Sequence, residues 1–134
     1  MSQAAASRKF KLDLKEEMAE ILDVEFPEFV KEVAISAAIG VVRRNPVLTG
    51  LSAGNWFAGS GDSSAIFPER KDPNKAVTIR RLISDITALA GTVKTIHIMN
   101  NQPYINRLED GYSLKAPTGM VAVTLREIES RYGI

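Results

Sequence analysis

The residues of this chain whose side chains could do chemistry are few and scattered. His97 is the only histidine, and the sequence has no cysteine. A catalytic triad or a metal centre needs further side chains of matching chemistry, and no Ser/Asp arrangement around His97 can be argued from the sequence. We therefore interpret His97 as a structural or surface residue, and the sequence predicts neither a metal site nor a thiol nucleophile.

A carboxylate pair, Glu109 and Asp110, stands in a segment whose pattern predicts a short helix. Adjacent residues on a helix point about 100° apart, whereas a glycosidase holds its two carboxyl groups roughly 5–9 Å apart across a sugar. The pattern therefore favours a structural role for Glu109. We expect it either to form a buried or interfacial ion pair or to accept hydrogen bonds from a backbone turn. The expected partner in an ion pair is an arginine, and the candidates are Arg43, Arg44, Arg81 and Arg126.

Two further features could bind phosphate groups. The loop Gly59-Ser60-Gly61-Asp62 has suitable glycine spacing, but no Lys-Ser/Thr pair follows it, which favours a hairpin tip. A basic cluster lies downstream, and it could either face DNA phosphates or form a solvated surface. It contains no interleaved aromatic residue on which bases could stack. Its members are Arg70, Lys71, Lys75, Arg80 and Arg81.

Composition bounds the remaining possibilities. The chain has 134 residues, which fits one domain, and its net charge of +1 predicts neither a nucleic-acid nor an acidic partner. Residues 1–9 are small and polar, so we expect a flexible arm over 1–10 ahead of a single domain over 11–134. No apolar run approaches the roughly 20 residues that cross a bilayer, so no membrane contact is predicted. We predict no cofactor and no catalytic residue, and therefore a protein that is not an enzyme and acts through contacts.

The clearest predicted element is a helix from about Pro27 to Arg44. Its apolar residues recur at spacings of three and four and fill two stripes, so the helix should be either sandwiched inside the fold or shared with a neighbouring subunit. It should stop at Asn45, because a residue that precedes proline is disfavoured in the helical region. The first stripe is Val30, Val33, Ala34, Ala37, Ala38 and Val41, and the second is Ile35, Ile39 and Val42.

Shorter elements follow this helix. Thr49-Gly50 is a turn signal, and the pattern predicts a strand within 51–60 whose Trp56 is either a core residue or an interface anchor. An irregular connection is expected over 65–75. The fold class is α+β, with a long N-terminal helix packed on a small, mainly antiparallel sheet and additional short helices. The remaining predicted elements are helices over 13–24, 77–89, 103–109 and 119–131, and a strand over 93–99.

Two stretches of the chain, residues 45–56 and 103–120, combine Pro, Gly, Trp, Tyr and Glu in an order that no catalytic motif requires. Together they resemble a family of tailed-bacteriophage tail-completion, neck-type proteins, over roughly residues 30–130. That family shows a proline-valine-x-threonine-glycine turn after a long helix, an Asn-Trp strand, a Leu-Glu-x-Gly-Tyr-Ser step and an Ala-Pro-x-Gly-Met step. Asn45 and Leu48 depart from the family's more usual Thr and Asp, and Lys115 stands where Gln is frequent. The matching positions are Pro46, Val47, Thr49, Gly50, Asn55, Trp56, Tyr104, Leu108, Glu109, Gly111, Tyr112, Ser113, Ala116, Pro117, Gly119 and Met120.

The resemblance implies a virion structural protein at the junction between tail tube and head, assembled in the cytoplasm of the bacterial host. Members of the family form rings, commonly with sixfold symmetry. The partners implied are further copies of this chain, the tail tube or tail terminator protein, and a head-side connector or head-completion protein, with DNA passing through the ring without sequence-specific binding. One alternative is a tail terminator ring, which stops polymerisation of the tube. The other is a host-encoded enzyme or nucleic-acid-binding module. The structural or interface candidates are Pro46, Thr49, Gly50, Trp56, Tyr104, Glu109, Gly111, Tyr112, Pro117 and Met120.

Overall fold

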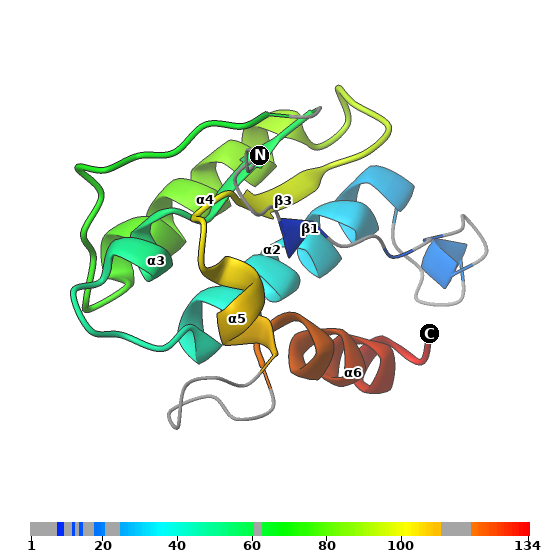
Figure 1. The fold of residues 1–134 in the computed structure, drawn as a ribbon. Helices are drawn as coiled ribbons and strands as arrows, with labels where there is room; N and C mark the ends of the chain where they lie inside the picture. The colour runs from blue at the N-terminus through cyan, green and yellow to red at the C-terminus, as the bar shows by residue number, and fades with distance from the viewer. Residues whose placement is uncertain are drawn as a thin grey trace.

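The computed structural model describes residues 8–9, 12, 14, 18–20, 25–60, 63–110 and 119–134. Figure 1 shows α2 crossing the middle of the molecule, with α4 and the strands on one side of it and α6 on the other. The α+β class predicted from the sequence is confirmed. The elements in chain order are β1 (Arg8–Lys9), α2 (Phe26–Arg44), α3 (Leu51–Gly54), β2 (Phe57–Gly59), α4 (Ala76–Leu89), β3 (His97–Asn100), α5 (Ile105–Glu109) and α6 (Val121–Tyr132).

The central helix α2 confirms the long helix predicted from the apolar spacing. Pro27 lies in its first turn, where a missing N–H removes no helical hydrogen bond. Asn45 leaves the helical region with a ψ of 124°, as expected for a residue before proline. α2 packs against both α4 and α6, so its apolar stripes are largely covered within one chain. Its buried residues are Phe29, Val33, Ala37, Ala38, Gly40, Val41 and Val42.

The three strands form one antiparallel sheet in the order β1-β3-β2. β1 pairs with Met99 and Asn100, and β2 pairs with residues 97–99. Residues 8 and 9, which were expected in a flexible arm, therefore form an edge strand. β3 is shorter than the strand predicted over 93–99. Ile98 and Met99 are both buried although they point to opposite faces of the sheet, so both faces are covered at these two residues.

Two local predictions were wrong. The strand expected within 51–60 is preceded by the short helix α3, and only Phe57–Gly59 is extended. The segment after Gly59 is not a hairpin tip, because the strand that pairs with β2 is β3, almost forty residues further along the chain. Of the helix predicted over 13–24, residues 18–20 are helical and Leu14 is not; the other positions, and Gly61 and Asp62, lie outside the described residues.

The later helices agree with the sequence-based predictions. α4 ends at Leu89, and Gly91 follows it with a φ of 82°, the left-handed conformation with which helices commonly end. The connection over 65–75 is irregular, as expected. No helix among the described residues combines the length and apolar character that crossing a membrane requires. The largest fully buried apolar side chains are Trp56, Phe29, Leu82, Ile86, Met99, Ile105, Met120 and Ile128.

Candidate functional site

The loop that follows α2, residues 45–50, is built around a buried amide side chain, and we call it the Leu48 loop. Asn45 is 1% exposed. Its Oδ1 accepts hydrogen bonds from the Ser52 hydroxyl at 3.0 Å and from the Trp56 indole N–H at 2.9 Å, and its Nδ2 donates to the Pro46 carbonyl at 2.8 Å. Trp56 itself is fully buried, so of its two expected roles it takes the core one.

Gly50 ends the Leu48 loop in the left-handed backbone conformation, which is unfavourable for residues with a Cβ atom. Its φ is 85°, and a Cβ atom there would lie 2.3 Å from the Pro73 nitrogen and 2.6 Å from the Asp72 carbonyl carbon. The Gly50 carbonyl accepts the amide N–H groups of Gly54 at 2.9 Å and of Asp72 at 3.0 Å. The predicted tight turn is confirmed, although it leads into α3 and not directly into a strand.

The tip of this loop presents an apolar side chain to solvent. Leu48 is 94% exposed, although Thr49 beside it is held by its Oγ1, which accepts the Leu51 amide N–H at 3.2 Å. Val77, in the first turn of α4, is 53% exposed. The end of α2 and the start of α4 lie together in Figure 1, at the same end of the molecule as the loop. This end therefore carries two apolar side chains that contribute little to the core of the single chain.

A lysine ties the start of α4 to the end of α2. The Lys75 ammonium donates a hydrogen bond to the Arg43 carbonyl at 2.7 Å, and a cation suits the negative end of a helix dipole. Partial burial lowers the pKa of Lys75. Lys75 has a φ of 70°, the only positive φ among the described non-glycine residues. The hydrogen bond of its side chain fixes the start of α4 against the end of α2.

The basic cluster is not one continuous cationic surface. The Arg81 guanidinium turns inward and donates to the Gly54 carbonyl at 2.8 Å, and burial followed by the charge of Arg70 lowers its pKa. The Arg70 guanidinium lies 3.6 Å from the centre of the Phe67 ring. With Lys75 bonded to α2, three of the five cations have structural partners. The two cluster members that are exposed are Lys71 and Arg80.

Asp72 holds the start of α4. Its Oδ2 accepts the amide N–H and the hydroxyl of Thr78, both at 2.7 Å. Burial opposes ionisation of Asp72, but the hydrogen bonds from Thr78 and from the Lys75 backbone, together with the charge of Arg81, outweigh it and hold the pKa of Asp72 below its ordinary value. The carboxylate is therefore bound more strongly by the folded chain than by the unfolded one.

We expect Asp72→Asn to lower the free energy of unfolding by about 1–2 kcal/mol at neutral pH, the usual worth of such a cap. Because the folded-state pKa is depressed, this stabilisation is full above the unfolded pKa of about 3.9 and is lost as pH falls through the folded pKa. Urea unfolding of both proteins between pH 7 and pH 3 measures it. A stability difference that stays constant down to the lowest pH would contradict the assignment.

Glu109 captures the N-terminus of α6. Its Oε1 accepts the amide N–H groups of Met120 and Val121, both at 2.8 Å, and its Oε2 accepts that of Ala122 at 3.0 Å. These are donors that a helix leaves without internal partners, and the helix dipole favours a negative charge there. Gly119 has a φ of 85°, and a Cβ on it would lie 2.5 Å from the Glu109 carbonyl oxygen. The close approach that positions the cap thus requires a glycine.

The prediction of an arginine partner for Glu109 was wrong. Its carboxylate instead accepts hydrogen bonds from backbone N–H groups, which was the alternative prediction. Arg44 instead forms an ion pair with Glu127 of α6 at 2.9 Å, and Arg81 bonds to a carbonyl of α3. Arg43 and Arg126 are exposed. The positive partner of Glu109 is therefore the N-terminus of α6, whereas an arginine side chain was expected from the sequence.

We expect Glu109→Gln to lower the free energy of unfolding by about 1–2 kcal/mol, because the charge at the helix N-terminus is lost and one acceptor oxygen is replaced by a donor. Glu129→Gln, on the exposed side of α6, is the matched control and should change stability by less than about 0.5 kcal/mol. Equal effects of the two substitutions in urea unfolding would refute the capping role.

The remaining structural or interface candidates differ in their exposure to solvent. Met120 is fully buried and Tyr104 is 38% exposed; burial of part of the ring raises the pKa of the Tyr104 hydroxyl. Gly111, Tyr112 and Pro117 lie outside the described residues. Tyr104 is therefore the one aromatic candidate, among those described, that reaches the surface.

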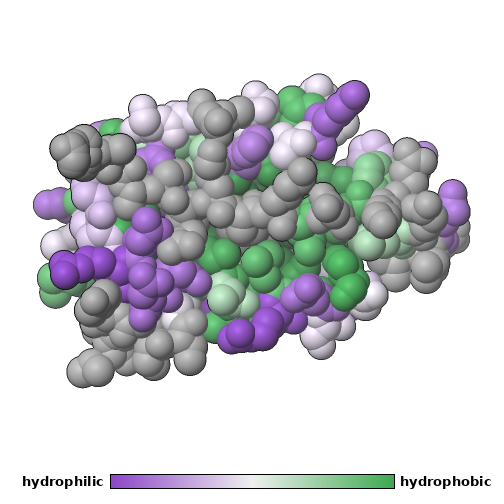
Figure 2. Space-filling model, turned by 45° about the vertical axis from the view of Figure 1, so that its right-hand side comes forward, coloured by the Kyte–Doolittle hydropathy of each residue, from purple (hydrophilic) through white to green (hydrophobic). Residues whose placement is uncertain are grey.

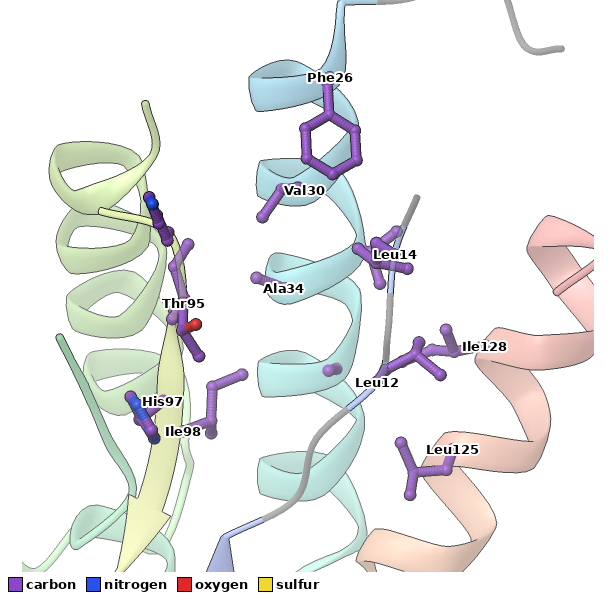
Figure 3. A pocket seen from close by; sticks show the side chains of 14 residues that line it. Leu12, Leu14, Phe26, Val30, Ala34, Thr95, His97, Ile98, Leu125 and Ile128 are labelled. Carbon is purple, nitrogen blue, oxygen red and sulfur yellow. The ribbon is translucent and has the colours of Figure 1, made fainter. Parts of the chain in front are cut away.

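An apolar groove, which we call the α2 groove, lies between α2, β3 and α6 and has a volume of about 470 Å³. Figure 3 shows Phe26, Val30 and Ala34 along one stripe of α2, with residues of β3 beside them and Leu125 and Ile128 of α6 beyond. Leu12 and Leu14 of the chain's own N-terminal part also line the groove. Apolar side chains gather in the middle of the face that Figure 2 shows, between polar and charged ones.

Sequence reasoning missed a set of buried amide side chains that hold the loops together. The Asn55 amide donates to the carbonyls of Leu51 and Phe67 at 2.8 and 3.0 Å, and its oxygen accepts the Phe67 amide N–H at 2.7 Å. Asn100 donates to the Ser52 carbonyl at 2.9 Å. The run Asn100-Asn101-Gln102, which begins with the last residue of β3, was the available signal, since buried amides need several hydrogen-bond partners.

The single histidine lies beside the apolar groove. His97 lies on β3 opposite Gly59 and lines the α2 groove. Among the described residues, no group of three or more His, Asp or Glu side chains could hold a metal ion. Comparisons with protein-family models, with curated proteins and with solved structures found no match for this chain.

Proposed function

We propose that this chain is a structural subunit of the head–tail junction of a tailed bacteriophage, a tail-completion or neck protein. In this proposal six copies form a ring around the DNA passage. One face of the ring meets the tail tube or the tail terminator protein, and the other meets the head-side connector. The chain acts through these contacts and catalyses no reaction.

The observation that carries the proposal is what the residues shared with the phage family do in this fold. Gly50 and Trp56 build the Leu48 loop, and Glu109, Gly119 and Met120 build the start of α6. None of these five residues lines the α2 groove. These five described positions thus shape two connections between elements and lie outside the α2 groove, as suits a protein that works by presenting surfaces to partners.

An exposed apolar loop, and not the two apolar stripes of α2, is our reason to expect a ring. α2 alone does not require a partner subunit, because α4 and α6 pack on it. The Leu48 loop favours a partner, because hydrogen bonds fix a loop whose central side chain is 94% exposed. Large exposed apolar patches mark contact surfaces, and we infer that Leu48 and Val77, which lie at the same end of the molecule, contribute to one.

The test is removal of this chain from the phage that carries it, followed by electron microscopy of the particles. We expect full heads and finished tails that fail to join, and rescue by the wild-type chain and by His97→Ala. Tails of uncontrolled length would support the tail terminator alternative. Infectious particles made without the chain would refute both, and loss of infectivity with normal particles in His97→Ala would indicate a chemical role.

A further inference from the structure

We propose that the Leu48 loop of one copy of this chain inserts into the α2 groove of the next copy, so that the subunits join head to tail. The inference rests on the proposed assembly into a ring, and it specifies which two surfaces meet. A ring requires a heterologous contact, in which two different surfaces of the same chain are complementary. The described residues include a protruding apolar surface, the Leu48 loop, and a recessed one, the α2 groove.

The protruding surface is rigid and apolar at its tip. Leu48 is 94% exposed, yet Asn45 and Gly50 on either side of it are anchored to buried parts of the fold. A loop backbone held in this way loses little conformational freedom on binding, which favours affinity. Val77 enlarges the apolar area at the same end.

The recessed surface is the α2 groove. Phe26, Val30 and Ala34 follow each other at spacings of four, so they form one stripe along α2. All three are only partly buried, although Leu12 and Leu14 already contribute to the lining. The remaining volume of about 470 Å³ exceeds what one leucine side chain needs, so the loop tip can enter it.

The exposed charges do not lie on the apolar stripe of the groove. Glu28 and Glu32 are each two residues from members of the stripe Phe26, Val30 and Ala34, which places them on roughly the opposite side of α2. Among the described residues that line the groove, the charged one is Lys94. The end that carries Leu48 exposes Glu69 as well as Arg43, Lys71 and Arg80. We therefore expect the contact to be held by its apolar surfaces.

The two surfaces cannot meet within one chain. Val30 and Arg44 are fourteen residues apart on α2, which separates them by about 21 Å along the helix axis. A disulfide requires Cα atoms within about 7 Å. The chain has no natural cysteine, so the pair Leu48→Cys and Val30→Cys can form a disulfide only between copies.

Oxidation of the double variant, under conditions where the wild-type chain assembles, should give a covalent ladder that ends at the full ring. Each single variant should give no ladder, and a mixture of the two single variants should stop at covalent dimers. The wild-type chain could assemble while the double variant cross-links no further than the single variants. That result would overturn the proposed contact but would not contradict the proposed ring. A wild-type chain that stays monomeric, both alone and in the particle, would refute the proposed ring itself.

A second pair of variants tests the contact without cross-linking. Leu48→Ala should weaken self-association roughly 10- to 100-fold, the equivalent of losing a buried leucine side chain, and should leave the thermal unfolding midpoint of the subunit unchanged. Ser84→Ala, exposed in the middle of α4, is the control and should change neither. Unchanged association in Leu48→Ala, measured by light scattering over a concentration series, would overturn the proposal.

Discussion

Gly50→Ala should lower the free energy of unfolding by roughly 3–5 kcal/mol, the largest loss that we expect from a single added methyl group. One part of the cost is the backbone conformation, because a φ of 85° costs residues with a Cβ about 1–2 kcal/mol. The larger part is steric. The added Cβ would lie 2.3 Å from the nitrogen of Pro73 and 2.7 Å from that of Asp72, and backbone atoms cannot move aside without disturbing the cap of α4.

Gly91→Ala separates these two costs. Gly91 has a φ of 82°, almost the same as Gly50, but the nearest atom to an added Cβ is 3.9 Å away in Pro27. Gly91→Ala should therefore lower the free energy of unfolding only by the cost of the backbone conformation, about 1–2 kcal/mol. Urea unfolding of both variants measures the difference. If the two substitutions cost the same, the contact of the Leu48 loop with the segment before α4 does not constrain the fold.

Long elements of this fold could be predicted from the sequence, because their signals are local. The position of Pro27 in the first turn of α2, and the end of α2 at Arg44 before Asn45-Pro46, follow from the geometry of proline. The end of α4 follows from Gly91 in the same way. The short elements could not be predicted, because tertiary contacts decide them. β1 is two residues long and is a strand only because β3 lies beside it.

The candidate site could be predicted in part. The turn at Gly50 and the structural role of Glu109 were recognised from residue type and order. The partner of Glu109 was not recognised. It is a helix N-terminus twelve residues later in the chain, and a search for side chains of opposite charge does not find it. Leu48 was noticed only as a departure from a family pattern. Its exposure depends on how Asn45 and Gly50 fold the loop, and sequence spacing does not report that.

Asn45→Ala should lower the free energy of unfolding by roughly 2–5 kcal/mol, because it removes one acceptor that two buried donors share. The Trp56 indole N–H and the Ser52 hydroxyl both bond to the Asn45 Oδ1, at 2.9 and 3.0 Å. Trp56 is 0% exposed and Ser52 is 7% exposed, so neither can turn to bulk water. A buried polar group left without a partner costs about 1–3 kcal/mol. Asn74→Ala, at an exposed position in the turn before α4, is the matched control and should stay within about 0.5 kcal/mol of the wild-type chain.

A double-mutant cycle shows whether the unpaired indole is the cause. Trp56→Phe removes the N–H, so in that background Asn45→Ala leaves one fewer donor unpaired and should cost at least about 1 kcal/mol less than in the wild-type chain. Both substitutions should also change how the loop presents Leu48, because Asn45 joins the last residue of α2 to the loop and to the core. Equal costs of Asn45→Ala in both backgrounds would show that the Asn45–Trp56 hydrogen bond does not support the loop.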